Sequence, residues 1–219
     1  MMRVVRKLRF ALAICIFACA AFAQRDWQER DRWQKPAEVM DALHLAANSH
    51  VADVGAGSGY FTLRLAERVG HGGKVYAVDI DRQSLNDLHK LAAEHNLTQI
   101  EVIQGAPDNP HLPAGQLDAV LIVNAYHEFR QHDQMLQAIA RALKPGGYFG
   151  IIEKADEPGE PRATYERRHH LPEQFVREDL ARNGFPQVEK KPDFHPSSER
   201  EGETWYFLVA QRPTQELPK

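Results

Sequence analysis

The sequence is poor in cysteine. The 219 residues include only 2 cysteines, Cys15 and Cys19, and both lie near the N-terminus. If that segment is removed, the body of the protein has no cysteine. It then forms no disulfide, uses no thiolate nucleophile and binds no metal through sulfur. Chemistry in the body must therefore use other side chains or a cofactor.

Long hydrophobic runs and an excess of basic residues are also absent. The apolar run 10–23 is shorter than the roughly 20 residues that span a bilayer as a helix. The 27 basic and 30 acidic side chains give a formal net charge of −3 without a basic stripe. We therefore expect no nucleic-acid partner, because that binding depends on neutralising phosphates. A content of 43% hydrophobic and 26% charged residues excludes a disordered chain, a fibre and a multispan membrane protein.

The N-terminus has the pattern of an export signal. A basic stretch precedes the apolar run, which ends in Ala21-Phe22-Ala23 before Gln24. This order predicts a secretory signal peptide over residues 1–23 and an exported protein, periplasmic or secreted. Its removal would leave 23 basic against 30 acidic side chains, a net charge of −7. The alternative is an uncleaved segment that anchors the chain to a membrane, although the mature chain offers no stable span.

The rest of the chain alternates strands and helices. Residues 24–35 are polar, contain Trp27 and Trp33, and are expected to form an N-terminal lid or linker. Residues 36–212 are expected to form one domain, and residues 213–219 a loose tail. We expect strands at 51–54, 74–78, 100–103, 119–123, 148–152, near 188 and at 205–210. We expect helices from Pro36 and at 60–69, 82–95, 132–143 and 172–182, and a charged loop at 156–168.

This alternation predicts an α/β fold of βαβ units. Right-handed crossovers place helices on both faces of a mostly parallel sheet. The last two strands have a short connection between them, which favours antiparallel pairing at one edge. The expected architecture is therefore a Rossmann-like, doubly wound, seven-stranded sheet with an antiparallel edge strand.

A glycine loop follows the first predicted strand, in the stretch Asp53-Val-Gly-Ala-Gly-Ser-Gly59. Glycines at alternate positions let the backbone turn sharply and approach a ligand closely. Asp79 ends the next strand, where an acidic side chain accepts hydrogen bonds from the hydroxyls of a ribose. Both features lie at strand ends, where open α/β sheets bind ligands. They predict a nucleoside site.

The loop differs from the dinucleotide fingerprint Gly-x-Gly-x-x-Gly. Its spacing is Gly-x-Gly-x-Gly, and Tyr60 follows the last glycine. Asp53 adds a carboxylate that would attract an ammonium and repel a pyrophosphate. The loop therefore favours a nucleoside with a positively charged tail. A nicotinamide-dependent oxidoreductase on a related fold remains the less favoured alternative.

At these residues the sequence resembles the class I S-adenosylmethionine-dependent methyltransferases. The matching stretches are Val51–Thr62, Val75–Asp81, Leu117–Asn124 and Leu143–Gly147, within a region of roughly Pro36 to Lys154. The resemblance is nearest to the group that acts on small molecules, which includes quinone-ring methyltransferases. It implies S-adenosylmethionine as cofactor and a small, aromatic or quinone-like methyl acceptor.

The resemblance also implies cofactor contacts. The loop Gly55-Ala56-Gly57-Ser-Gly59 would surround the methionine part, and Asp53 would face its amino group. Asp79 would bind the ribose hydroxyls and Ile80 would pack on the adenine. Asp108 would lie near the adenine amino group, although Pro107 departs from the usual pattern. Asn124 would lie near the sulfonium.

The segment Asn124-Ala-Tyr-His-Glu-Phe129 would face the acceptor. Asn124, Tyr126 and His127 are the candidate catalytic residues. His127 would take a proton from a hydroxyl, because its pKa ordinarily lies near neutrality, or it is a histidine bonded in the core. Tyr126 or Phe129 would stack on a planar acceptor. A dedicated base is optional, because the cofactor itself activates the methyl group.

Two further features leave alternatives open. His169 and His170 are adjacent, but no third ligand stands at a recognised metal-binding spacing, so we expect no metal site. The export signal conflicts with a cofactor made inside cells. A noncatalytic, exported S-adenosylmethionine-binding protein is therefore the second hypothesis.

Overall fold

The computed structural model describes residues 27–192 and 203–214. The signal peptide predicted over residues 1–23 lies outside this part of the chain. The chain divides into two units between Lys35 and Pro36. In the first unit, residues 27–34 are helical, and Arg30 Nε donates to Gln34 Oε1 at 2.8 Å. Within the described ranges, no helix has the length and apolar character needed to cross a membrane.

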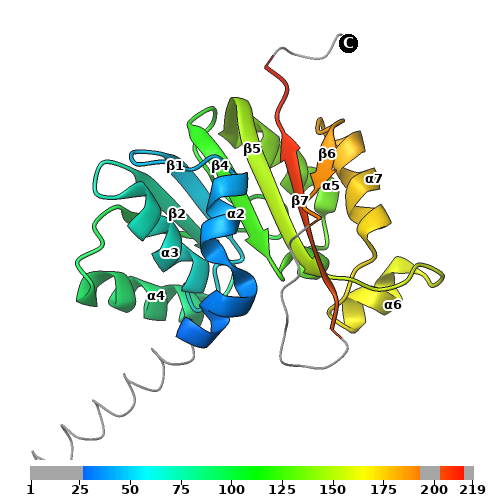
Figure 1. The fold of residues 1–219 in the computed structure, drawn as a ribbon, viewed down its shortest axis with the longest axis horizontal. Coiled ribbons are helices and arrows are strands. Elements are labelled where there is room, and N and C mark those ends of the chain that lie inside the picture. Colours follow the sequence, from blue (N-terminus) through cyan, green and yellow to red (C-terminus); the bar gives the residue numbers. More distant parts are fainter. Residues whose placement is uncertain (1–26, 193–202, 215–219) are drawn as a thin grey trace, which may run out of the picture. The chain divides into compact units, whose positions relative to one another are not determined.

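The second unit contains a seven-stranded sheet in the order β3-β2-β1-β4-β5-β7-β6 (Figure 1). Its strands are β1 (His50–Val54), β2 (Lys74–Asp79), β3 (Ile100–Gln104), β4 (Leu117–Val123), β5 (Leu143–Lys154), β6 (Val188–Lys190) and β7 (Trp205–Gln211). The first five strands pair in parallel. Strand β7 pairs antiparallel with both β5 and β6. The predicted α/β, mostly parallel fold is confirmed.

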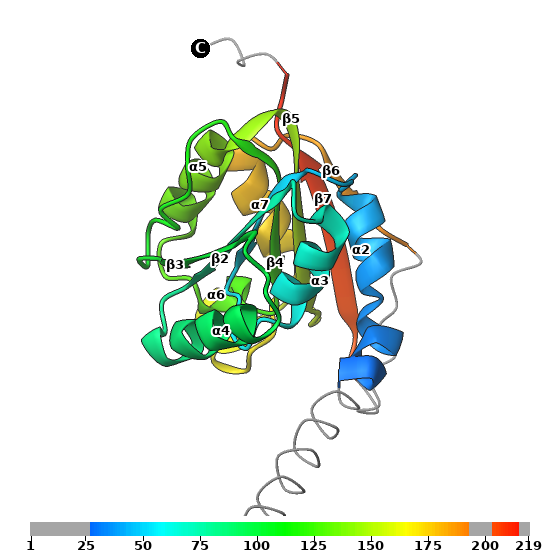
Figure 2. The same ribbon diagram turned by 90° about the vertical axis from the view of Figure 1, so that its left-hand side faces the viewer.

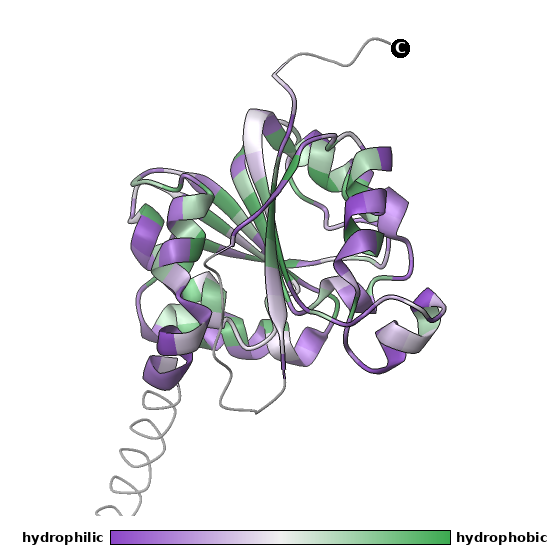
Figure 3. Cartoon of the chain, turned by 45° about the vertical axis from the view of Figure 1, so that its right-hand side comes forward, coloured by the Kyte–Doolittle hydropathy of each residue, from purple (hydrophilic) through white to green (hydrophobic). Residues whose placement is uncertain are grey.

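Helices cover both faces of the sheet. They are α2 (Pro36–Ala42), α3 (Tyr60–Val69), α4 (Arg82–Glu94), the 3₁₀ turn η1 (Tyr126–Glu128), α5 (His132–Ala142), α6 (Arg162–Arg167) and α7 (Glu173–Arg182). Figure 2 shows α2 and α3 on one side of the sheet and α5 on the other. The strands between them are rich in apolar residues (Figure 3), and alternate buried residues of β4 and β5, among them Val120 and Ile151, are in the main core cluster.

Local sequence explains where the helices near the ligand edge begin. Gly59, with φ of 83°, turns the chain into α3, and a side chain at this φ would be strained. Asp81 caps α4, because its carboxylate accepts the backbone N–H of Ser84 at 2.8 Å. Both helices bury the apolar residues that recur at helical spacing, including Leu63 and Leu88.

Two elements differ from the prediction. The charged segment 156–168 was expected to be a loop, but it contains α6. A salt bridge of 3.0 Å joins Arg162 to Glu166 one turn later, and Tyr165 is buried. Strand β5 begins earlier than expected, at Leu143, because Leu143 already pairs with Leu117 of β4. The prolines and charges obscured these local interactions.

Candidate active site

The candidate site lies at the carboxyl ends of β1, β2 and β4. Strand β1 is central, with β2 and β4 as its two neighbours. The strand order changes direction between β1 and β4, because the chain adds β2 and β3 on one side and β4 and β5 on the other. Open α/β sheets bind ligands at such points. A cavity of about 420 Å³ opens there, within the usual size of small-ligand sites. Its walls include Gly55, Gly57, Asp79, Ile80, Asn124 and Phe129.

The glycine loop forms one wall through Gly55 and Gly57. Gly55 donates its N–H to the Val78 carbonyl at 2.8 Å, which holds the loop against β2. A Cβ at Gly55 would lie 2.4 Å from Ala125 Cβ, whereas a Cβ at Gly57 would meet no atom within 4 Å. Gly55 therefore permits close packing, and Gly57 leaves open space.

Ala56 and Gly59 of the loop face the core. Gly59 is buried, and a Cβ there would lie 2.3 Å from Leu88 Cδ1. Ala56 is also buried and belongs to a small cluster with Ala77 and Leu88. Neither residue lines the cavity. Their role in this structure is to let α4 pack against the loop.

Asp79 connects the glycine loop to the end of β2. One carboxylate oxygen accepts the N–H of Gly57 at 2.8 Å, and the other accepts the N–H of Asp81 at 2.9 Å. An ionised carboxylate has about four acceptor positions, so both oxygens keep capacity for a ligand. Ile80 follows on the cavity wall. Its side chain is large, hydrophobic and 60% exposed. It therefore offers an apolar surface on which a planar ring would pack.

Two further predicted cofactor contacts are not on the cavity wall. Asp53 is 2% exposed, and its carboxylate accepts the Thr62 hydroxyl at 2.6 Å. Its charge therefore lies beneath the loop. Asp108 is exposed, and its neighbours Ala106 and Pro107 line the cavity instead.

Asn124 immediately follows β4 and faces the cavity. Its backbone has a φ of 51°, an unusual value that Asn tolerates better than most residues. The backbone N–H donates to the Ile152 carbonyl at 2.8 Å. The side-chain Oδ1 is buried and has no hydrogen-bond partner within the described ranges. A buried acceptor without a partner at a cavity wall indicates a missing donor.

Tyr126, predicted to contact the acceptor, is placed in the core. It is fully buried, and its hydroxyl donates to Asp179 at 2.9 Å. Burial, followed by the charge of Asp179, raises the pKa of Tyr126 well above its ordinary value, so the hydroxyl keeps its proton. This placement fits a structural role, whereas Phe129 lines the cavity.

His127 is also buried, at 1% exposure. Its Nδ1 lies 2.9 Å from a carboxylate oxygen of Glu153, and its Nε2 lies 3.1 Å from Nδ1 of His169. Glu153 is itself completely buried. Sequence reasoning missed Glu153, although an acidic residue at the end of the apolar strand β5 signals this edge of the sheet.

Glu128 also lines the cavity. One of its carboxylate oxygens lies 3.7 Å from His127 Nε2. Arg130 lies 3.4 Å from Glu166 of α6. The segment after β4 thus contributes Asn124, Glu128 and Phe129 to the cavity.

This arrangement fits a nucleoside with a cationic tail. Asp79 offers acceptors for ribose hydroxyls, Ile80 offers an apolar surface, and the orphaned Oδ1 of Asn124 needs a donor. The cavity walls also include the carboxylate of Glu128. The residues present therefore fit S-adenosylmethionine.

Comparison with known proteins supports the same class. Residues 51–147 match a family model described as a methyltransferase domain. An uncharacterised methyltransferase of Mycobacterium tuberculosis is 36% identical over 124 residues, which cover 57% of this chain and 47% of that protein. A demethylmenaquinone methyltransferase of Lactobacillus johnsonii is 33% identical over 132 residues, covering 59% and 52%. The chain thus spans about half the length of these curated relatives.

Solved structures share the fold. A crystal structure of an S-adenosylmethionine-dependent methyltransferase from Aquifex aeolicus has a TM-score of 0.68 at 23% identity. The match covers 83% of this chain and 92% of that one. The solved structure shows the fold, and the family model and the relatives show that this part of the chain is similar to methyltransferases.

Proposed function

We propose that this protein transfers a methyl group from S-adenosylmethionine to a small, planar, quinone-like acceptor. The observation that carries the proposal is the junction at the ends of β1, β2 and β4. There Gly57 donates to Asp79 at 2.8 Å, and the Asn124 side chain presents a buried acceptor without a partner. A glycine platform, a ribose acceptor and an unpaired amide on one cavity wall suit this cofactor.

Each of these residues would contact a different part of the cofactor. Gly55 and Gly57 would bring the backbone close to the methionine part, because neither has a side chain in the way. Asp79 would accept the ribose hydroxyls while keeping its bonds to the loop. Ile80 would cover the adenine. Asn124 would accept a hydrogen bond through Oδ1 near the reacting centre.

The cofactor, when bound, supplies a methyl group already activated on a sulfonium. The chain must therefore mainly orient the acceptor and exclude water. Phe129 and Met135 provide apolar cavity wall on the acceptor side. Glu128 lies beside them, where its carboxylate would accept a hydrogen bond from an acceptor hydroxyl.

A quinone-like acceptor is supported by two observations. One relative is named as a demethylmenaquinone methyltransferase. Phe129 gives the cavity an aromatic side chain on which a flat ring would stack. The test is an assay of methyl transfer from labelled cofactor to a panel of hydroquinones and catechols. Labelled product with a planar hydroxyl compound supports the proposal, and transfer only to aliphatic amines would contradict it.

We also propose that the mature protein is exported, on the strength of the basic, apolar and Ala-x-Ala pattern in residues 1–23. That location favours one second candidate function, an exported protein that binds S-adenosylmethionine without catalysis. The same assay separates the two. Cofactor binding without turnover on any acceptor would favour the noncatalytic protein.

A further inference from the structure

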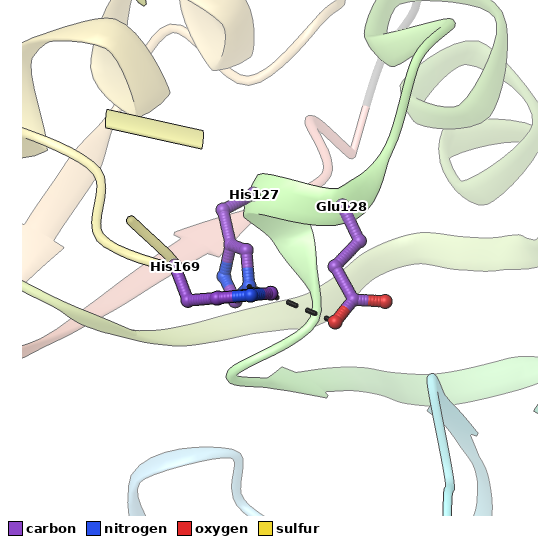
Figure 4. A group of neighbouring side chains, drawn as sticks. All are labelled: His127, Glu128 and His169. Atoms are coloured by element: carbon purple, nitrogen blue, oxygen red, sulfur yellow. Dashed lines mark hydrogen bonds and ion pairs between the residues drawn. The ribbon is translucent and has the colours of Figure 1, made fainter. Parts of the chain in front are cut away.

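Three potential metal ligands gather beside the cavity, and one of them, Glu128, lines its wall. His127 and Glu128 come from η1, and His169 comes from the turn after α6. One ligand atom from each lies within 4.8 Å of the other two. Figure 4 shows the three side chains facing one another across the gap between these segments. His127 and His169 are far apart in the sequence, so their spacing does not reveal the cluster.

The hydrogen bond to Glu153 decides which nitrogen of His127 faces the cluster. An ionised carboxylate only accepts, so the Nδ1 of His127, 2.9 Å away, carries the proton. The Nε2 is then the nitrogen that faces His169 and Glu128. Histidines that bind metals commonly donate their other N–H to a carboxylate in this way, which fixes the tautomer and ring orientation.

The distances suit a common metal ion. His127 Nε2 lies 3.1 Å from His169 Nδ1 and 3.7 Å from Glu128 Oε1. Nitrogen ligands of tetrahedral zinc are ~3.3 Å apart when the bonds are ~2.0 Å long. Glu128 is exposed, so its carboxylate can adjust by a side-chain rotation.

Hydrogen bonds of the backbone hold the two histidines of the cluster in place. Glu153 Oε1 accepts the backbone N–H groups of Tyr126 at 2.6 Å and His127 at 3.3 Å. The His169 N–H donates to the Glu166 carbonyl at 3.1 Å, and its φ of 58° is strained for a residue other than glycine. Strained backbone is frequent at functional sites, and here it directs the ring toward His127.

We infer that His127, Glu128 and His169 bind one divalent transition-metal ion of the zinc class. Two imidazoles and a carboxylate are a ligand set of catalytic zinc, which keeps a further position open. Glu128 lines the cavity, so the open position would accept an oxygen of the acceptor. This last assignment rests on the proposed methyltransferase function, whereas the metal site itself does not.

His170 provides a matched control. It neighbours His169 in sequence but faces Asp156, with Nδ1 3.7 Å from that carboxylate. The test variant is His169→Asn, because Asn tolerates the left-handed backbone and the position is exposed. The control variant is His170→Asn.

The experiment is calorimetric titration of Zn²⁺ into chelator-treated full-length protein, without cofactor or acceptor. Titration with Co²⁺ alone adds a visible absorption spectrum that reports the ligand geometry. We expect one ion per wild-type chain, at least about tenfold weaker binding in His169→Asn, and no change in His170→Asn. Intense Co²⁺ bands should appear in wild type and be lost in His169→Asn.

Equal Zn²⁺ affinity in wild type and His169→Asn would overturn the site, and so would equal losses in both variants. A plain hydrogen bond between the two histidines would produce that first result. Co²⁺ spectra of an octahedral ion that are lost in His169→Asn would support the ligand set but overturn the zinc class. Each outcome can be read without methyl transfer, so failure of the metal site and failure of the proposed function are distinguishable.

Discussion

The backbone N–H of Gly57 donates to the carboxylate of Asp79 at 2.8 Å, which joins the glycine loop after β1 to the end of β2. This bond sets the loop before any ligand enters. It also places the carboxylate on the wall of the cavity. Asp79 is thus the residue through which loop geometry and ligand recognition are most directly coupled.

We expect Asp79→Ala to weaken S-adenosylmethionine binding by about ten- to a hundredfold. Hydrogen bonds to a charged group contribute about 1.5–3 kcal/mol each, and about 1.4 kcal/mol corresponds to tenfold in affinity. Asp108→Ala is the control, because Asp108 is exposed and does not line the cavity. Calorimetry measures both. If Asp108→Ala weakened cofactor binding equally, Asp108 would contact the cofactor as the sequence predicted.

Gly55→Ala and Gly57→Ala should separate packing from ligand access. Both positions have positive φ, 81° and 50°, so alanine costs roughly 1–2 kcal/mol at each. Only the Gly55 substitution also meets Ala125, at 2.4 Å, which adds about 1–3 kcal/mol. Denaturant unfolding should therefore show Gly55→Ala as the less stable variant.

Gly57→Ala should lose cofactor affinity despite its smaller effect on stability, because its methyl group would enter the open space beside the cavity wall. The explanation fails if the two variants are equally stable, or if Gly57→Ala binds S-adenosylmethionine as tightly as wild type.

Tyr126→Phe tests whether this tyrosine is structural. The change removes the 2.9 Å hydrogen bond to Asp179 and should lower the free energy of unfolding by about 1.5–3 kcal/mol. S-adenosylmethionine affinity should stay unchanged, because Tyr126 is fully buried and does not line the cavity. A stable variant with an abolished methyl-transfer rate would instead support the catalytic role predicted from the sequence.

Asp179 should make stability fall at acidic pH. Burial raises the pKa of this carboxyl, but hydrogen bonds and charge from Arg162, with bonds from Tyr126 and Arg182, outweigh burial and lower it. The unfolded chain therefore binds the proton more tightly. The stabilisation is complete above the ordinary pKa of about 3.9 and is lost as pH falls through the lower folded value.

The measurement is urea unfolding across acidic pH for wild type and Asp179→Asn. We expect wild type to be the more stable protein near neutrality and the difference between them to shrink below about pH 4. A difference that stays constant with pH would show that Asp179 does not titrate with folding.

Much of the cofactor side could be predicted from the sequence, because its signals are local. The glycine loop, Asp79 and Asn124 each follow an apolar strand, and parallel strands bring such positions to one edge. The directions in which the loop residues face could not be predicted in this way. Gly59 and Ala56 face α4 rather than the cavity, a distinction that depends on where Leu88 packs.

The acceptor side could not be predicted in the same way, because its contacts join distant segments. His127 meets Glu153 from β5 and His169 from the turn after α6. Those partners lie 26 and 42 residues away, and no periodic pattern links them. Whether Tyr126 faces the acceptor or the core likewise depends on η1, a short turn that the sequence did not reveal.

The central claim is that the cavity binds S-adenosylmethionine, and calorimetric titration of the purified protein tests it most directly. We predict one cofactor molecule bound per chain, weakened in Asp79→Ala, and no measurable binding of NAD. Binding of NAD without binding of S-adenosylmethionine would contradict the account.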